Sequence, residues 1–105
     1  MNHLTIEESL TLLSSKTEKF LEVFTHGSLT IEIYKPDNID LQKPHSRDEV
    51  YIIAEGLGSF KHLDQIAKVK KGDFLFVAAG DEHRFFDFSE DFSTWVIFYG
   101  PEGGE

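Results

Sequence analysis

Two histidines and one glutamate have the types and the spacing to hold a metal ion. His45 is followed four residues later by Glu49, and His83 opens the later run HRFFDF. A loop that runs into a strand can bring His45 and Glu49 together, and a neighbouring strand can add His83. Two imidazoles and a carboxylate are the ligands of many non-haem iron sites, and they also suit zinc, manganese or nickel. Taken singly, each of the three is more often a structural side chain than a ligand.

Side chains on the same strand faces define the expected pocket. Tyr51 follows Glu49 by two residues, so the alternation of a strand places both on one face. Phe85 and Asp87 share a face with His83 in the same way. We therefore expect Tyr51, Phe85 and Asp87, with Lys43 near His45 in the sequence, to line a pocket around the three candidate ligands.

Composition limits the chemistry and the partners. The 105 residues include ten Lys and Arg against nineteen Asp and Glu, a net charge of −9, and no cysteine. The missing cysteines exclude disulfides, thiolate catalysis, iron–sulfur clusters and cysteine-bound zinc. The acidic balance disfavours nucleic acids and anionic membrane surfaces as partners. No run approaches the roughly 18 apolar residues of a membrane helix, and the start MNHLTIEESL lacks the pattern of a signal peptide. A cytoplasmic protein is the simplest interpretation.

The elements that must position these residues are one helix followed by strands. LTIEESLTLLSS carries Thr5 as N-cap with Glu8 in a capping box, and it has apolar residues at helical spacing. From Phe20 onward the pattern changes to short runs rich in β-branched and aromatic residues, bounded by turn residues. These runs are FLEVFT, LTIEIY, EVYIIA, GSFKHL, QIAKV, DFLFVAA, HRFFDF and STWVIFY. With ten phenylalanines to fill an interior, they predict one mostly-β barrel or sandwich with an N-terminal helix.

Two stretches in the middle of the chain resemble the two cupin motifs. The first motif has the usual form G-x5-H-x-H-x3,4-E-x6-G, and His45, Glu49 and Gly56 match its second half in register. GDFLFVAAGDEHRFFD resembles the second motif, with Gly72, Gly80 and His83 on its glycines and histidine. The resemblance covers about residues 29–99. It implies a small jelly-roll barrel, the cupin double-stranded β-helix, in a single domain over 1–105. Within that domain we expect a helical cap at 1–19, the barrel at 20–99 and a flexible tail at 100–105.

The resemblance also implies that His45, Glu49 and His83 are metal ligands, but one ligand is replaced. The first histidine of the first motif should stand at position 43, and this chain has Lys43. A protonated lysine facing the site would repel a cation, whereas a lysine pointing to solvent would not. Gln42 offers a carbonyl oxygen as a fourth ligand. Alanine and aspartate replace the second motif's proline and asparagine at positions 78 and 87.

The second half of the chain resembles small stand-alone bacterial cupins with no established reaction, so three functions stay open. The first is a metal-dependent oxygenase, isomerase or lyase acting on a small metabolite, using Fe, Mn, Ni or Zn; Glu49 could alternatively act as a base without metal. The second is a small-molecule binding module without turnover, its metal site degraded by Lys43. The third is a fold in which the motif residues are structural relics. Cupins of this size are commonly homodimers, and the doubly apolar run STWVIFY is consistent with that arrangement.

Overall fold

One helix and eight strands follow each other in the predicted order. The computed structural model describes residues 1–105, and each of the eight predicted runs contains one strand. The elements are α1 (Ile6–Ser14), β1 (Phe20–His26), β2 (Leu29–Tyr34), β3 (Asp48–Glu55), β4 (Leu57–His62), β5 (Gln65–Lys70), β6 (Phe74–Val77), β7 (His83–Phe86) and β8 (Ser93–Tyr99).

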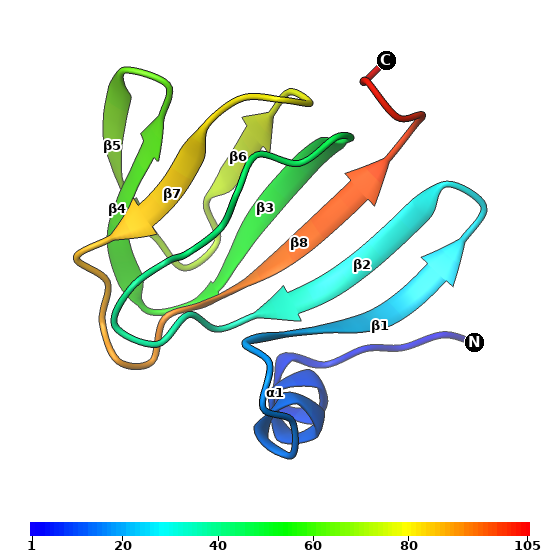
Figure 1. The fold of residues 1–105 in the computed structure, drawn as a ribbon. Coiled ribbons are helices and arrows are strands. Elements are labelled where there is room, and N and C mark those ends of the chain that lie inside the picture. The colour runs from blue at the N-terminus through cyan, green and yellow to red at the C-terminus, as the bar shows by residue number, and fades with distance from the viewer.

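The strands form two antiparallel sheets. The larger has the order β1-β2-β8-β3-β6 and the smaller the order β5-β4-β7. The smaller sheet and the connection between β2 and β3 lie over the inner face of β3 and β8 (Figure 1). No ladder of hydrogen bonds joins the two sheets, so the barrel is not closed.

The chain passes from the large sheet to the small one at Gly56. This glycine has φ +80°, and a Cβ there would lie 2.5 Å from Ser89 Oγ and 2.8 Å from Phe92 Cα. Both the left-handed backbone and the crowding require glycine. The glycine that ends the first motif is therefore the hinge between the sheets.

Aromatic side chains fill the space between the sheets. The ring of Phe85 lies 5.0 Å from that of Tyr51, 4.7 Å from Phe60 and 4.9 Å from Phe92. All four rings are buried, and contacts at such centroid distances favour edge-on and tilted packing. This core supports one end of the candidate site, because Tyr51 and Phe85 belong to the strands that carry Glu49 and His83.

Helix α1 covers only part of the outer face of the large sheet. Its N-cap is as predicted, because Thr5 Oγ1 accepts a hydrogen bond from Glu8 N at 3.0 Å. Leu13 packs on Ile33 and Ala54 of the sheet, and Figure 1 shows the helix beside β1 and β2. The structure holds no helix with the length and apolar character that crossing a bilayer requires.

The final residues lie against the segment that enters β3. The backbone N–H of Gly103 donates to Ser46 O at 2.6 Å, and that of Glu105 donates to Asp48 Oδ2 at 2.9 Å. A second Asp48 oxygen accepts from Ala79 N at 2.9 Å, so Asp48 points away from the candidate ligands. The flexibility expected for 100–105 stays a prediction.

Candidate metal centre

Three elements bring His45, Glu49 and His83 together. Glu49 lies in β3, His83 begins β7, and His45 lies in the long connection between β2 and β3. Their candidate ligand atoms all lie within 4.8 Å of one another. Glu49 and His83 are buried and His45 is half-buried, so the cluster is shielded but has an open side.

The distances are those of a site that needs a small adjustment to hold an ion. His83 Nε2 lies 2.9 Å from Glu49 Oε1, and His45 Nε2 lies 3.9 Å from Glu49 Oε2. Adjacent ligands around an ion with bonds of about 2.1 Å are roughly 3 Å apart. The pair of Glu49 and His83 already has this spacing. His45 would have to move inward by a side-chain rotation.

Glu49 is the least satisfied polar group in the cluster. Its side chain is 1% exposed, and neither carboxylate oxygen takes part in a hydrogen bond. His83 Nε2 is near enough to attract Glu49 Oε1, but it is aligned with the Tyr51 hydroxyl at 2.9 Å instead. A buried carboxylate without hydrogen bonds is costly unless a cation is present. The donor set therefore fits a metal ion.

His83 is held in the orientation that a metal ligand needs. Its Nδ1 donates to the Asp81 carbonyl at 2.8 Å, which directs Nε2 into the cluster. An imidazole whose second nitrogen is bonded to a carbonyl is the usual arrangement for a ligating histidine. Burial opposes the charged imidazole, but the Glu49 carboxylate oxygen 2.9 Å from Nε2 and the Asp81 carbonyl bonded to Nδ1 outweigh it and raise the pKa of His83.

Gln42 directs its amide oxygen at the cluster. Its Oε1 accepts a hydrogen bond from the Tyr51 hydroxyl at 2.8 Å and lies 3.3 Å from His45 Nε2. Its Nε2 donates to Asp40 Oδ2 at 2.8 Å, which fixes the amide orientation. Burial, together with the charge of Glu49, raises the pKa of Tyr51, so this hydroxyl stays a hydrogen-bond donor.

Asp40 is a residue of the site that the sequence analysis missed. It is buried, and it accepts hydrogen bonds from the Tyr34 hydroxyl at 2.6 Å and from Phe85 N at 2.8 Å, besides those from Gln42. These bonds tie the connection between β2 and β3 to both sheets. An aspartate within KPDNIDLQKP carries no sequence signal that separates it from an ordinary loop aspartate.

The four expected pocket residues divide into two pairs. Tyr51 contacts the cluster directly, and Phe85 packs beneath Tyr51 in the core. Lys43 is exposed, in the wall of a hollow that it shares with Lys61 and with two candidate ligands, Gln42 and His83. Asp87 is exposed just beyond β7 with φ +49°, so the strand face that would carry it inward ends before it. The structure does not bring Asp87 to the cluster.

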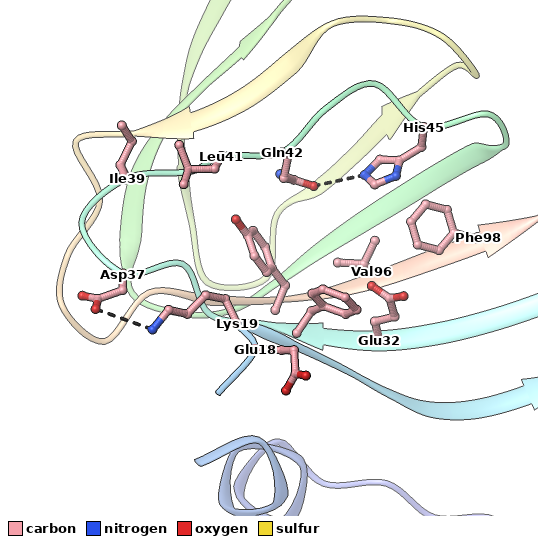
Figure 2. Close-up of a pocket in the computed structure, with 12 residues that line it drawn as sticks. Glu18, Lys19, Glu32, Asp37, Ile39, Leu41, Gln42, His45, Val96 and Phe98 are labelled. Carbon is pink, nitrogen blue, oxygen red and sulfur yellow. Dashed lines mark hydrogen bonds and ion pairs between the residues drawn. The ribbon is translucent and has the colours of Figure 1, made fainter. Parts of the chain in front are cut away.

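A cleft of about 510 Å³ opens beside the cluster. It lies between the inner face of β2 and β8 and the connection between β2 and β3, with Gln42 and His45 in its wall (Figure 2). Glu32 is also in this wall, half-buried. Its alternation with apolar residues in LTIEIY is typical of a solvent-facing position, and the sequence alone does not show that this face lines a cleft.

Similarity to known proteins identifies the fold. A cupin-2 domain protein from Shewanella frigidimarina superposes with a TM-score of 0.75 at 17% identity, over 92% of this chain and 94% of that one. A cupin superfamily protein from Desulfitobacterium hafniense gives 0.64 at 16% identity, over 78% and 76% of the two chains. No protein-family model matches the chain. The two sheets, with their His/Glu/His cluster, are a cupin fold, as the motifs predicted.

Sequence similarity then identifies the family. The uncharacterised protein SCO3923 from Streptomyces coelicolor is 32% identical over 85 residues, which are 79% of this chain and 81% of that protein. The chain, a small cupin by its fold, belongs to the same family as SCO3923.

Proposed function

We propose that the protein binds one divalent transition-metal ion through His45, Glu49 and His83. The observation that carries this proposal is the Glu49 carboxylate, which is buried between two imidazoles and accepts no hydrogen bond. The Gln42 amide oxygen, held toward His45, is the fourth protein ligand. It takes the place of the histidine that Lys43 replaces.

The donor set restricts the metal to a group of ions. Two imidazole nitrogens, a carboxylate and an amide oxygen suit Fe, Mn, Ni or Zn, and the choice among them depends on supply in the cell. When bound, such an ion supplies Lewis acidity or, in the case of iron, O₂ activation. The 510 Å³ cleft gives a small molecule access to the side of the cluster that His45 leaves open.

The chain's own residues prepare the site for such a ligand. The Tyr51 hydroxyl, whose pKa is raised by burial, holds the Gln42 amide oxygen in place by a hydrogen bond. The apolar side chains of Val96 and Phe98 keep water away from one side of the cleft. With metal bound and a substrate in the cleft, the protein would act as an oxygenase, isomerase or lyase. Without turnover, the same cleft and cluster would serve to bind a small molecule.

Metal content measured on two matched variants tests the proposal. Protein purified without chelator should hold about one ion per chain. His83→Ala should lower the affinity for that ion by about 100-fold or more, because loss of a group that only supports the ligands already lowers it about 10- to 100-fold. His26→Ala, which removes an exposed imidazole at the end of β1, should change nothing. Folded wild-type protein that holds no metal and takes up no added Fe, Mn, Ni or Zn would refute the site.

We infer also that two copies pair through the outer face of β3, β6 and β8. On this face Phe76 is 45% and Phe74 62% exposed. Val50 lies opposite Phe76 on one side and Ile97 on the other, which makes a continuous apolar row. An apolar strip of this kind on an otherwise acidic chain favours a partner surface of the same character.

A further inference from the structure

The cleft beside the cluster contains one carboxylate that has no partner. Glu32 extends from β2 on the same wall as Val96 and Phe98, across from Gln42 and His45 (Figure 2). It is half-buried, and its side chain makes no hydrogen bond and no ion pair. The strand register places Glu22 directly beside it on β1, so its nearest charged neighbour along the sheet is also an acid.

The cations near Glu32 are engaged elsewhere. Arg47 lines an adjoining hollow with Glu32 and His45, but its Nε donates to Gly100 O at 3.0 Å and its Nη2 donates to Ser28 O. Lys19 is the cation among the lining residues, and its Nζ lies 3.6 Å from Asp37 Oδ2 at the rim. Glu18 adds a further negative charge. Burial, and then the charges of Glu22 and Glu49, raise the pKa of Glu32 to about 7. Ionised Glu32 therefore lacks the cation that a partly buried carboxylate needs.

The remaining lining is suited to an apolar body. Six of the twelve lining residues are hydrophobic, and Val96 and Phe98 stand next to Glu32 on the inner face of the sheet. The volume of about 510 Å³ lies within the usual range of roughly 300 to 1,000 Å³ for small-molecule pockets. A ring or short alkyl group can rest on this wall while a polar group reaches Glu32.

We propose that the cleft selects small amines: an apolar or aromatic body lies on Val96 and Phe98, and a protonated amino group pairs with Glu32. This inference rests on the proposed function, because it names the ligand class of the cleft that serves the metal centre. A cation supplies the charge that Glu32 lacks, whereas an anion would meet Glu18, Glu22 and Glu32 together. The amine pairs with the carboxylate and leaves the metal ligands unchanged.

Three probes that share a phenyl ring but differ in the charge of the polar group test the ligand class. Benzylamine, benzyl alcohol and benzoate are titrated against EDTA-treated protein at about pH 8, where Glu32 is ionised and the amine is still charged. We expect benzylamine to bind about tenfold more tightly than benzyl alcohol, the size of one partly screened charged contact, and benzoate to bind most weakly. Glu32→Gln should remove the preference for the amine. Glu7→Gln, which removes the same charge from the exposed face of α1, should keep it.

The outcomes separate this inference from the metal proposal. Equal affinities for benzylamine and benzyl alcohol, or an amine preference that survives in a folded Glu32→Gln variant, would overturn the inference. Metal uptake is measured on separate samples of the same proteins prepared without EDTA, and Glu32→Gln should bind metal as the wild type does. An amine preference in a protein that never takes up metal would support the inference while refuting the metal centre.

Discussion

The Gln42 amide can face the cluster in only one way. Its nitrogen donates to Asp40 and its oxygen accepts from Tyr51, so a flip would place two donors, or two acceptors, against each other. The cupin motif places a histidine at position 43, yet Lys43 is exposed. The local path of the loop thus brings position 42, and not position 43, to the candidate ligands.

Substitutions at positions 42 and 43 should differ in their effect on metal affinity. Gln42→Ala removes an oxygen 3.3 Å from His45 Nε2, and we expect the affinity for Zn²⁺ or Mn²⁺ to fall about tenfold, as for a neutral ligand or supporting group. Lys43→His should leave the affinity unchanged, because that side chain points to solvent. Titration calorimetry on both variants measures this. A large gain in affinity with Lys43→His would show that position 43 does face the ion.

Glu32 should make stability depend on pH in a defined direction. Its pKa rises from 4.5 to about 7 on folding, so the unfolded chain ionises first. Below about pH 4.5 the group is neutral in both states and costs nothing. Between the pKa of Glu32 in the unfolded chain and its pKa in the folded protein, ionisation stabilises the unfolded state only. The free energy of unfolding therefore falls as pH rises, and the loss is complete above about pH 7.

Urea unfolding of the metal-free protein at about pH 5 and pH 8 measures this loss. Because the side chain is half-exposed and partly screened by water, we expect the free energy of unfolding to fall by about 1 kcal/mol, less than the pKa shift of Glu32 would give for a fully buried group. Glu32→Gln should lose that much less stability than the wild type between the two pH values, and Glu7→Gln should match the wild type. Equal pH slopes in wild type and Glu32→Gln would show that the carboxyl titrates normally.

At the scale of elements, the connection between β2 and β3 carries two of the four candidate ligands and has no regular structure of its own. Asp40 supplies the missing order by binding Tyr34 in one sheet and Phe85 in the other. The hydroxyl of Tyr34 is kept neutral, because burial and Asp40 raise its pKa. One buried carboxylate therefore positions Gln42 and, three residues later, the segment of His45.

Asp40→Ala should weaken both the fold and the metal site. Four donor groups lose a shared acceptor, and we expect a loss of about 2 to 4 kcal/mol in the free energy of unfolding, together with lower metal affinity. Asp37→Ala is the matched control, because its ion pair with Lys19 is largely exposed and such pairs contribute about 0 to 1 kcal/mol. Urea denaturation gives the first quantity and metal titration the second. Unchanged metal affinity in folded Asp40→Ala would mean that the loop is positioned by other contacts.

The alternation of residues predicted the strands, but not how their faces are used. In LTIEIY the apolar positions include Ile33, which is buried beneath α1 on the outer face, whereas Glu32 points into the cleft on the inner face. A half-buried pattern gives the period of a strand but not the side on which the core lies. The candidate ligands could be predicted because a two-part motif fixes their register. Asp40 and Glu32 could not, since their roles depend on pairing between distant strands.

At the scale of the molecule, the outer face of the large sheet is covered unequally. The helix protects β1 and β2, while the rows of β8, β3 and β6 remain partly open, with Trp95 opposite Ile52 and Ile52 opposite Phe74. The chain as a whole carries a net charge of −9. Repulsion between copies is thus weakest where this uncharged face meets a second one. The same asymmetry leaves the cleft, on the inner face, free in a dimer.

Phe76→Lys should convert the proposed dimer into a monomer. The lysine places a charge at the β6 end of the apolar row, beside Val50, and a charge buried there without a partner costs several kcal/mol. Light scattering coupled to size-exclusion chromatography should give twice the 12.0 kDa chain mass for the wild type and the single mass for the variant. Leu63→Lys, at an exposed position between β4 and β5 of the other sheet, should remain dimeric. A wild-type mass of one chain at all concentrations would refute the pairing, and dissociation by Leu63→Lys alone would place the interface on the smaller sheet.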